Sequence, residues 1–397
     1  MNVAPTINIA QASAPLWDAI VIGAGPAGAI AALELVRRGH STLLVERCAF
    51  PRAKVCGGCL NSGALVMLKE LGLEHTLSAG YAAPVNRFVV HARKRAVALD
   101  LPAGAAIERA AFDAALTAAA IDAGVAFLPE TTATVTSGDS PDSASRTVTL
   151  TSTDQQISTA HGRVVLAADG LGHASVRHLE AFRASTVAEA RIGLGLTVRE
   201  PHGAYDSGAI HMGVARHGYV GLVRTADGNL NVAAAVDPAA LRAAGGPANL
   251  INEILREANM AMLSAVDTRA WRGTLPLTRA SGTLADRRVF LLGDAAGYVE
   301  PFTGEGMGWA IASATAVVPY AQRLITTSDE SCELTWQAVQ QRQIARGQFA
   351  CRILAPLLRR PLIVEMALRA LQAVPSVANP LVRRIQSGPV PLQTSMS

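Results

Sequence analysis

The chain has 397 residues, of which half are hydrophobic and 17% are charged, a composition typical of a globular protein with an ample core. The formal net charge of +4 is small, and basic and acidic residues are well mixed, which argues against nucleic acid as the main partner. A chain of this length exceeds what one hydrophobic core usually covers, so we expect two domains or one large α/β domain with a satellite.

The N-terminal segment and the cysteines indicate the compartment. Residues 1–15 have no basic start and no long apolar run, so they do not resemble a signal peptide. No stretch reaches the roughly 18 consecutive apolar residues that a membrane span needs. Five cysteines are few and odd in number, which favours free thiols in a reducing compartment. We therefore expect a cytoplasmic protein.

The first predicted unit is a strand, a glycine turn and a helix within residues 17–47. A β-branched apolar run ends at Gly23, and the Ala/Leu-rich stretch that follows suits a helix. Gly23 suits a tight turn, Gly25 lets a pyrophosphate approach the backbone, and Gly28 lets helix and strand pack closely. This order of elements predicts a dinucleotide site.

A second apolar run follows the helix and ends in Glu46. An acid at this point can accept hydrogen bonds from ribose hydroxyls, and the lack of an arginine there disfavours a 2′-phosphate, so NAD or FAD is expected. The residues predicted to contact the dinucleotide are Gly23, Gly25, Pro26, Ala27, Gly28, Glu46 and Arg47.

Two cysteines, Cys56 and Cys59, flank the glycine pair at 57–58, and three interpretations compete. A zinc site needs four ligands, and the sequence shows no second CxxC or HxxxH partner, so no metal site is predicted. A redox dithiol suits a disulfide reductase, but that class typically carries a second glycine fingerprint for NAD(P)H, which the sequence lacks. The third interpretation rests on the glycines, which allow the backbone to approach a flat cofactor ring.

Residues 185–272 contain alternating runs that predict antiparallel strands, and residues 87–101 are expected to join them. We expect this sheet to form the substrate domain, as a wall opposite the cofactor. His211, Tyr219 and Arg224 are the candidate polar groups there for proton transfer or substrate orientation, with a core or surface role as the alternative.

A second strand, turn and helix pattern lies far along the chain. A buried-strand run ends at Gly293 and Asp294, and further glycines precede a helix expected to start near Met307. A carboxylate at a strand end can accept from a ribityl hydroxyl. Glycine amides at a helix N-terminus can hold the electron-rich N1/O2 edge of a flavin.

The pairing of an N-terminal GxGxxG with a distant GDAA…PxxGxG resembles the FAD-binding signature of the p-hydroxybenzoate hydroxylase and geranylgeranyl reductase superfamily. The resemblance implies FAD as cofactor, with NAD(P)H as external electron donor, and it places Asp294 on the ribitol. The residues that it assigns to the flavin end are Gly293, Asp294, Pro301, Gly304, Gly306 and Met307.

Three other segments resemble the same family. A strand ending at Asp169 resembles a region that contacts FAD and the nicotinamide donor, with a turn capped by Ser175 as the alternative. The helix start at Arg109 implies that this arginine reaches the cofactor from the side, with a solvated helix end as the alternative. The Cys-Gly-Gly sequence resembles the geranylgeranyl-reductase-like branch and implies that Cys56, Gly57 and Gly58 shape the flavin pocket.

Related halogenases and reductases carry a second aromatic residue and a proline after the position of Tyr219. Gly221 stands in place of that aromatic residue here, and no proline follows. The departure argues against a halogenase and indicates a roomier cavity.

The C-terminal part from Gln343 onward is predicted to be helical and basic. A peripheral contact with a membrane and a docking helix with a solvated face are the two interpretations. The arginines spaced among its apolar residues are Arg359, Arg360, Arg369, Arg383 and Arg384.

The predicted fold class is α/β, with a Rossmann-like FAD-binding domain, an inserted antiparallel-sheet substrate domain and a C-terminal helical region. The expected boundaries are 16–80, 105–175 and 275–345 for the FAD-binding domain, 81–104 and 176–274 for the substrate domain, and 346–397 for the helical region.

The leading functional hypothesis is an FAD-dependent monooxygenase that hydroxylates an apolar or aromatic small molecule through a flavin C4a-hydroperoxide shielded from water. The alternative is a geranylgeranyl-reductase-like flavoenzyme that reduces C=C bonds of an isoprenoid. A non-catalytic flavin-binding protein is a minor alternative. The substrate, the electron donor and the oligomeric state stay open at this point.

Overall fold

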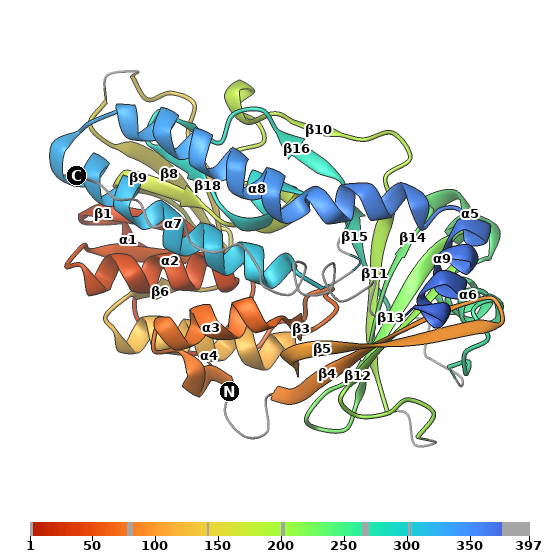
Figure 1. Ribbon diagram of the computed structural model, residues 1–397. Helices are drawn as coiled ribbons and strands as arrows, with labels where there is room; N and C mark the ends of the chain where they lie inside the picture. Colours follow the sequence, from red (N-terminus) through yellow and green to blue (C-terminus); the bar gives the residue numbers. More distant parts are fainter. Residues whose placement is uncertain are drawn as a thin grey trace.

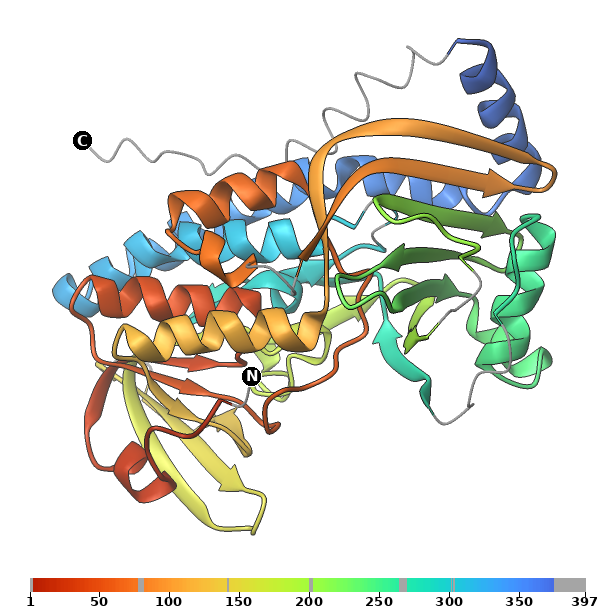
Figure 2. The same ribbon diagram turned by 90° about the horizontal axis from the view of Figure 1, so that it is seen from below.

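A computed structural model of the chain is shown from two directions in Figures 1 and 2. Within the residues that it describes, the strands form two eight-stranded sheets and a small three-stranded sheet. The described residues are 3–77, 82–140, 143–199, 203–263, 270–300, 302 and 304–374.

The first sheet carries the predicted dinucleotide unit, and its central strands run parallel. Across the sheet the strands are β17 (Ala285–Asp286), β18 (Val289–Leu291), β9 (Ile157–Ala167), β1 (Leu16–Ile22), β2 (Thr42–Val45) and β6 (Ala126–Leu128), with β7 (Thr131–Val135) and β8 (Arg146–Ser152) beside β9. The helices packed on one face are α2 (Pro26–Arg37), α4 (Arg109–Asp122) and α7 (Gly306–Thr327).

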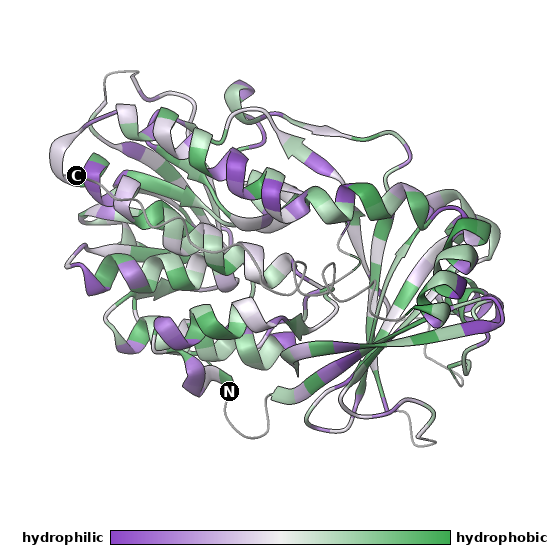
Figure 3. Cartoon of the chain, viewed as in Figure 1, coloured by the Kyte–Doolittle hydropathy of each residue, from purple (hydrophilic) through white to green (hydrophobic). Residues whose placement is uncertain are grey.

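Both faces of this parallel sheet are covered, which explains why its strands read as unbroken apolar runs. Ala19 and Val21 of β1 pack toward the helices. Ile20 and Ile22 pack on the other side, in a cluster with residues of β7 and β8. Figure 3 shows the resulting concentration of hydrophobic residues in the sheet and in α2.

The second sheet is mostly antiparallel, as expected for residues 185–272. Its strands, in order, are β15 (Arg272–Pro276), β11 (Ile192–Val198), β14 (Leu230–Val236), β13 (Gly218–Arg224), β12 (Ala209–Ala215), β4 (Ala82–Ala92), β5 (Arg95–Ile107) and β3 (Cys59–Leu60). The hairpin of β4 and β5 does join it, and β4 pairs with β12 in parallel. One face of the sheet packs on α6 (Pro247–Glu257).

Two helices follow α7 and run back across the molecule, as the blue ribbon in Figure 1 shows. They are α8 (Ser331–Leu357) and α9 (Pro361–Ala373), and α9 packs on β4, β5 and β12. The helical C-terminal region is thereby confirmed as far as residue 374, while Arg383 and Arg384 lie outside the described residues. None of the described helices has the length and apolarity that crossing a bilayer requires.

The remaining elements are short. They are α1 (Ile9–Ser13), α3 (Ser62–Glu70), α5 (Pro238–Ala243), β10 (Ala184–Thr186), β16 (Arg279–Ser281) and β19 (Gly297–Tyr298), the last three forming the small sheet.

A histidine pair in the second sheet predicts that the stability of the protein depends on pH. His91 Nε2 lies 3.4 Å from His211 Nδ1 across the β4/β12 pair. Burial, and then the charge of His211, lower the pKa of His91 from 6.5 to about 4. Between these two pH values the unfolded chain binds a proton that the folded chain does not, so stability falls as the pH drops through the window. We expect His91→Gln to flatten this fall in thermal unfolding experiments.

The same substitution at the exposed His75 is the control and should leave the pH profile unchanged. A His91→Gln profile that still falls as steeply as the wild type between pH 6.5 and 4 would contradict the assignment.

Candidate functional site

A cavity of about 630 Å³ lies where the carboxyl ends of β1 and β2 face the second sheet. In open α/β sheets, ligands bind outside the carboxyl ends of the strands, so this is the expected place for a cofactor. The structure brings most of the predicted site residues together there. Those that line the cavity are Gly23, Gly25, Pro26, Ala27, Glu46, Arg47, Cys56, Gly57, Gly58, Arg109, Asp169, Tyr219, Asp294, Gly304, Gly306 and Met307.

Four other predicted residues do not line it, and Pro301 lies outside the described residues. Gly28 is buried between helix and strand, and Gly293 borders a smaller cavity. His211 pairs with His91. Arg224 donates from Nε to the carbonyl of residue 205 and from Nη1 to that of residue 228. The structure therefore gives His211 and Arg224 no contact with the cavity.

The turn after β1 has the geometry that its glycines predict. Gly23 has φ +100°, where an L side chain is strained. A Cβ on Gly28 would lie 1.8 Å from the carbonyl oxygen of Gly23, so only glycine lets α2 approach the strand. Gly25 caps α2 and borders the cavity, with only Arg52 near a Cβ built there. The positive end of the α2 dipole therefore faces the cavity.

Glu46 stands at the end of β2, where its buried carboxylate braces the turn. Oε2 accepts from the amide of Ala24 at 3.0 Å, and Oε1 accepts from the amide of Cys48 at 3.1 Å. The guanidinium of Arg52 lies 3.2 Å from the same carboxylate. A carboxylate with two oxygens can still accept from a ribose hydroxyl, because each oxygen has more than one lone pair.

Sequence reasoning missed two cations that line the cavity, Arg52 and Lys54. Arg52 lies 3.4 Å from Asp113 and, through Nη2, 3.6 Å from where a Cβ on Gly25 would stand. Lys54 Nζ lies 3.7 Å from Asp294. Both flank the place where a pyrophosphate and a ribityl chain would run. Two basic residues leading into a Cys-Gly-Gly loop beside a glycine turn are the signal that could have indicated them.

Arg109 begins α4 and makes two hydrogen bonds to Asp113, at 2.9 and 2.8 Å. Burial lowers the pKa of Arg109, but the charge of Asp113 and then that of Cys56 more than offset it, so its pKa ends above the ordinary value. Arg109 is thus a fixed buried cation within reach of the Cys56 thiol.

The two cysteines differ in their surroundings. Cys56 lines the cavity, and its sulfur accepts from the amide of Gly58 at 3.4 Å. Cys59 is buried in β3, and burial, then the charge of Cys56, raise its pKa to about 12. A thiol with so high a pKa is a poor nucleophile, which weighs against a dithiol. Among the described residues, no three His, Cys, Asp or Glu side chains are grouped to hold a metal.

Asp169 follows β9 and lies at the wall of the cavity. Its Oδ2 accepts from the amide of Ser175 at 2.8 Å. Its Oδ1 is buried and has no hydrogen-bond partner among the described residues. Burial raises the pKa of this carboxyl. The Ser175 hydroxyl lowers the pKa of the same carboxyl in part, so the two side chains lie close together at the cavity wall.

The second sheet supplies an apolar wall. The side chains that face the cavity from this half include Phe88, Ile210, Met212, Val223 and Phe302. Gly221 leaves the expected room, but a Cβ there would already lie 3.2 Å from Met212 Cε, so the methionine fills part of it. Methionine is flexible enough to adapt to a bound chain.

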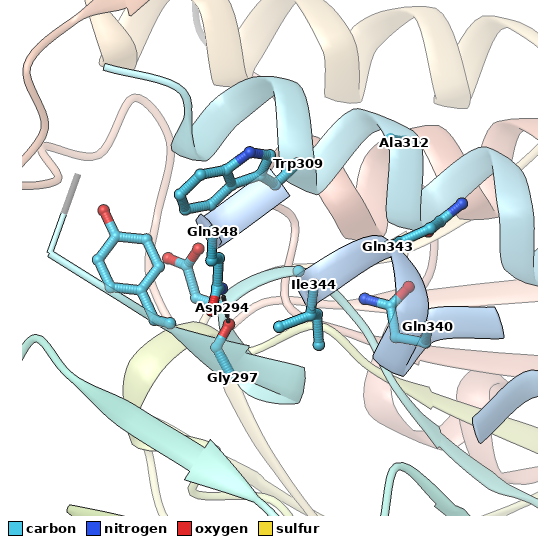
Figure 4. A pocket seen from close by; sticks show the side chains of 10 residues that line it. Asp294, Gly297, Trp309, Ala312, Gln340, Gln343, Ile344 and Gln348 are labelled. Atoms are coloured by element: carbon cyan, nitrogen blue, oxygen red, sulfur yellow. Dashed lines mark hydrogen bonds between the residues drawn. The ribbon is translucent and has the colours of Figure 1, made fainter. Parts of the chain in front are cut away.

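A second cavity of about 20 Å³ lies behind Asp294, between α7 and α8 (Figure 4). Gln340 Oε1, Gln343 Nε2 and Trp309 Nε1 border it, and none has a hydrogen-bond partner among the described residues. Gln348 donates to the carbonyl of Gly297 at 3.3 Å. The volume and the polar lining suit about one ordered water, which would satisfy these groups.

The comparisons with known proteins agree with this geometry. The model of a family described as FAD binding domain matches residues 17–326. The chain belongs to this family. The predicted relationship to FAD-dependent oxidoreductases is therefore confirmed, and the chain is a flavoprotein of mixed α/β fold.

Three curated relatives of this flavoprotein differ in their names. Conditioned medium factor receptor 1 of Dictyostelium discoideum is 25% identical over 330 residues, 77% of this chain, which spans 63% of the receptor. Menaquinone reductase of Mycobacterium tuberculosis is 26% identical over 375 residues, covering 87% of this chain and 84% of the reductase. Digeranylgeranylglycerophospholipid reductase 3 of Methanosphaera stadtmanae is 25% identical over 325 residues, 80% of each chain.

Solved structures show the same fold. A flavoprotein/dehydrogenase from Cytophaga hutchinsonii has a TM-score of 0.80 at 17% identity, covering 93% of this chain and 92% of its own. A flavin-dependent brominase has a TM-score of 0.77 at 15% identity, covering 94% of each chain.

Arg52 provides a test of the cofactor end. We expect Arg52→Gln to weaken FAD binding by roughly 10- to 100-fold, because a hydrogen bond to a charged group contributes about 1.5–3 kcal/mol. Flavin fluorescence during titration of the apoprotein measures the dissociation constant. Arg38→Gln, at a half-exposed ion pair with Glu34, is the matched control and should bind like the wild type. Unchanged affinity in a folded Arg52→Gln protein would remove Arg52 from the site.

Proposed function

We propose that this flavoprotein binds FAD along the large cavity and reduces carbon–carbon double bonds of a long apolar, polyprenyl-type molecule. The observation that carries the proposal is the continuity of the cavity, which joins the glycine turn after β1 to the apolar face of the second sheet. A cofactor extended from the turn would place its reactive end beside that face.

The residues at the polar end fit FAD. The pyrophosphate would lie at the N-terminus of α2 beside Gly25, where the helix dipole favours an anion. Glu46 would accept from the adenosine ribose, and Asp294 from the ribityl chain. The start of α7 at Gly306 would meet the flavin. Asp169 lines the same cavity.

When bound and reduced, FAD supplies the hydride that a double bond needs. The chain must then bind the reductant, orient the substrate, exclude water and provide a proton. NAD(P)H stays our prediction for the donor.

The apolar half of the cavity supports a hydrocarbon substrate. Burial of apolar surface contributes about 25 cal/mol per Å², so a chain laid along Phe88, Met212 and Phe302 binds by contact area alone. Such a wall also keeps water from the reacting carbons.

Two observations favour reduction over oxygenation, although the sequence alone favours a monooxygenase. Two relatives that match over most of their length are named as reductases of menaquinone and of a digeranylgeranyl lipid. The Cys-Gly-Gly loop, which resembles that branch, lines the cavity. Oxygenation is the second candidate, because an apolar cavity that excludes water serves it equally.

Turnover under nitrogen and under air separates the two reactions. FAD-loaded protein, NADPH or dithionite, and a menaquinone or a geranylgeranyl lipid would be incubated in both atmospheres and the products weighed by mass spectrometry. We expect a gain of two hydrogens per saturated bond without oxygen. A product that gains one oxygen atom, formed only in air, would replace reduction by hydroxylation. No product with any of these lipids would overturn the substrate class.

We also propose that the exposed face of α8 and α9 rests on an anionic membrane, the natural store of such lipids. The exposed apolar side chains there are Phe349, Ile353, Leu357, Leu362, Ile363 and Met366. The exposed arginines are Arg342, Arg346, Arg352, Arg360 and Arg369. Glu365, the acidic residue between 344 and 373, is paired with Arg93 and Arg369. Apolar side chains among arginines that outnumber the one acidic residue suit a negatively charged interface.

Vesicle flotation tests this contact. We expect the wild type to bind vesicles that contain phosphatidylglycerol but not vesicles of pure phosphatidylcholine. The double variant Phe349→Ser/Ile353→Ser should bind the phosphatidylglycerol vesicles roughly tenfold or more weakly, since each buried side chain contributes about 1.5–3 kcal/mol. Leu334→Ser, at an exposed leucine near the start of α8, is the control. Equal binding by the double variant, or no binding by the wild type, would contradict the proposal.

A further inference from the structure

A buried cluster of charged groups lies behind Tyr219. Arg191 is 0% exposed, and its Nη1 donates to Glu300 at 3.1 Å while its Nε donates to Asp237 at 3.2 Å. Glu300 is itself 3% exposed. Burying an ion pair is costly unless it is well bonded, so the position of such a cluster calls for a reason.

The register of the second sheet brings these groups together. Ile192 of β11 pairs with Val236 of β14, so the preceding Arg191 meets the residue after Val236. Tyr219 of β13 pairs with Ala235 on the other side of β14. The start of β11, the end of β14 and the start of β13 therefore share one end of the sheet.

Tyr219 connects the cluster to the cavity. Its side chain lines the cavity, with its ring edge-on to Phe302 at a centroid distance of 5.1 Å. The Arg191 guanidinium lies 5.7 Å from the centre of the tyrosine ring. The Tyr219 hydroxyl is buried and makes no hydrogen bond of ordinary geometry within the described residues. It is nevertheless close enough to Glu300 to lower the pKa of that carboxyl in part.

The Tyr219 hydroxyl is protonated at neutral pH, so it has a proton to donate. Burial, and then the charge of Glu300, raise the pKa of Tyr219 well above its ordinary value, so the hydroxyl keeps its proton at neutral pH. Burial raises the pKa of Glu300, although Arg191 opposes this. Both groups therefore hold protons more firmly than they would in water.

The far side of the cluster reaches the surface. Arg359, in the turn between α8 and α9, lies 3.0 Å from Asp237, and its side chain is 34% exposed. His217 Nδ1 lies 3.8 Å from the other oxygen of Asp237, and its side chain is 46% exposed. The cluster thus spans the distance from solvent to the cavity wall.

We propose that Tyr219 is the acid that donates a proton to the substrate, with Glu300 and Arg191 as positioning residues that hold it. This inference rests on the proposed reduction of a double bond. In that reaction the π bond breaks, one carbon receives the hydride, and the other forms a C–H bond as the O–H bond of Tyr219 breaks. The electron pair stays on the phenolate oxygen beside the cation of Arg191. The phenolate then takes a proton from solvent, so the double bond gains one hydride and one proton in total.

Tyr219→Phe tests this role, because it removes one oxygen atom and keeps the ring. Holoenzyme reduced under nitrogen would be mixed with a geranylgeranyl lipid, and flavin reoxidation would be followed by absorbance in H₂O and D₂O. We expect reoxidation to slow on the order of 100-fold or more, the usual contribution of a general acid, and the wild-type solvent isotope effect to disappear. FAD affinity and the rate of flavin reduction by dithionite should not change.

Glu300→Gln separates positioning from a structural role. It should slow reoxidation, and Tyr219→Phe/Glu300→Gln should be no slower than Tyr219→Phe alone, because both residues act in one step. A structural role would instead lower FAD content or the unfolding temperature.

Tyr320→Phe is the matched control, because Tyr320 is buried in α7 against Trp336, away from the large cavity. Wild-type reoxidation in Tyr219→Phe, or an equal loss in Tyr320→Phe, would overturn the assignment. A wild-type enzyme that forms no saturated product would instead overturn the proposed function, and this inference with it.

Discussion

The position of the loop that forms one wall of the cavity depends on one buried carboxylate, that of Asp113. It is 0% exposed, accepts two hydrogen bonds from Arg109, and lies 3.4 Å from Arg52. Removing one partner of a buried ion pair typically costs about 3–5 kcal/mol, so the two arginines are held firmly. Because Arg109 begins α4 and Arg52 belongs to the loop after β2, this contact fixes the loop against the helix layer. The loop then brings Arg52 to the glycine turn and Cys56 to the cavity.

Small residues at a second contact bring the two ends of the chain together. Gly293, in the turn after β18, is close enough to α2 that a Cβ on it would lie 3.1 Å from Cβ of Ala27. A larger residue at either position would push the turn away from the helix. The N-termini of α2 and α7 consequently border the same cavity, at Gly25 and Gly306. Two positive helix ends facing one space favour a ligand with negative charge at two separate points.

The sequence predicts those parts of the site that depend on residues close together in the chain. The spacing of Gly23, Gly25 and Gly28 indicates a tight turn between a strand and a helix, so this turn can be predicted from the sequence. The pairing of Arg52 with Asp113 joins residues far apart in sequence, and no local pattern reports it. Of the candidates predicted on the second sheet, Tyr219 lines the cavity, whereas His211 does not. The strand that carries His211, β12, is buried along its whole length. The alternation of apolar and polar residues along the strand therefore does not distinguish the face toward the cavity from the face toward α6. His211 lies on the face toward α6.

The C-terminal helices link the surface of the molecule to its interior. On its buried side α8 donates from Gln348 to the carbonyl of Gly297, in the segment that leads to the flavin turn. At its end, Arg359 donates to Asp237 and to the carbonyl of Glu189, beside the charge cluster behind Tyr219. The exposed side of the same helix carries apolar residues and arginines. The same helix and the turn after it therefore join the exposed apolar and basic face to the segment before the flavin turn and to the charge cluster.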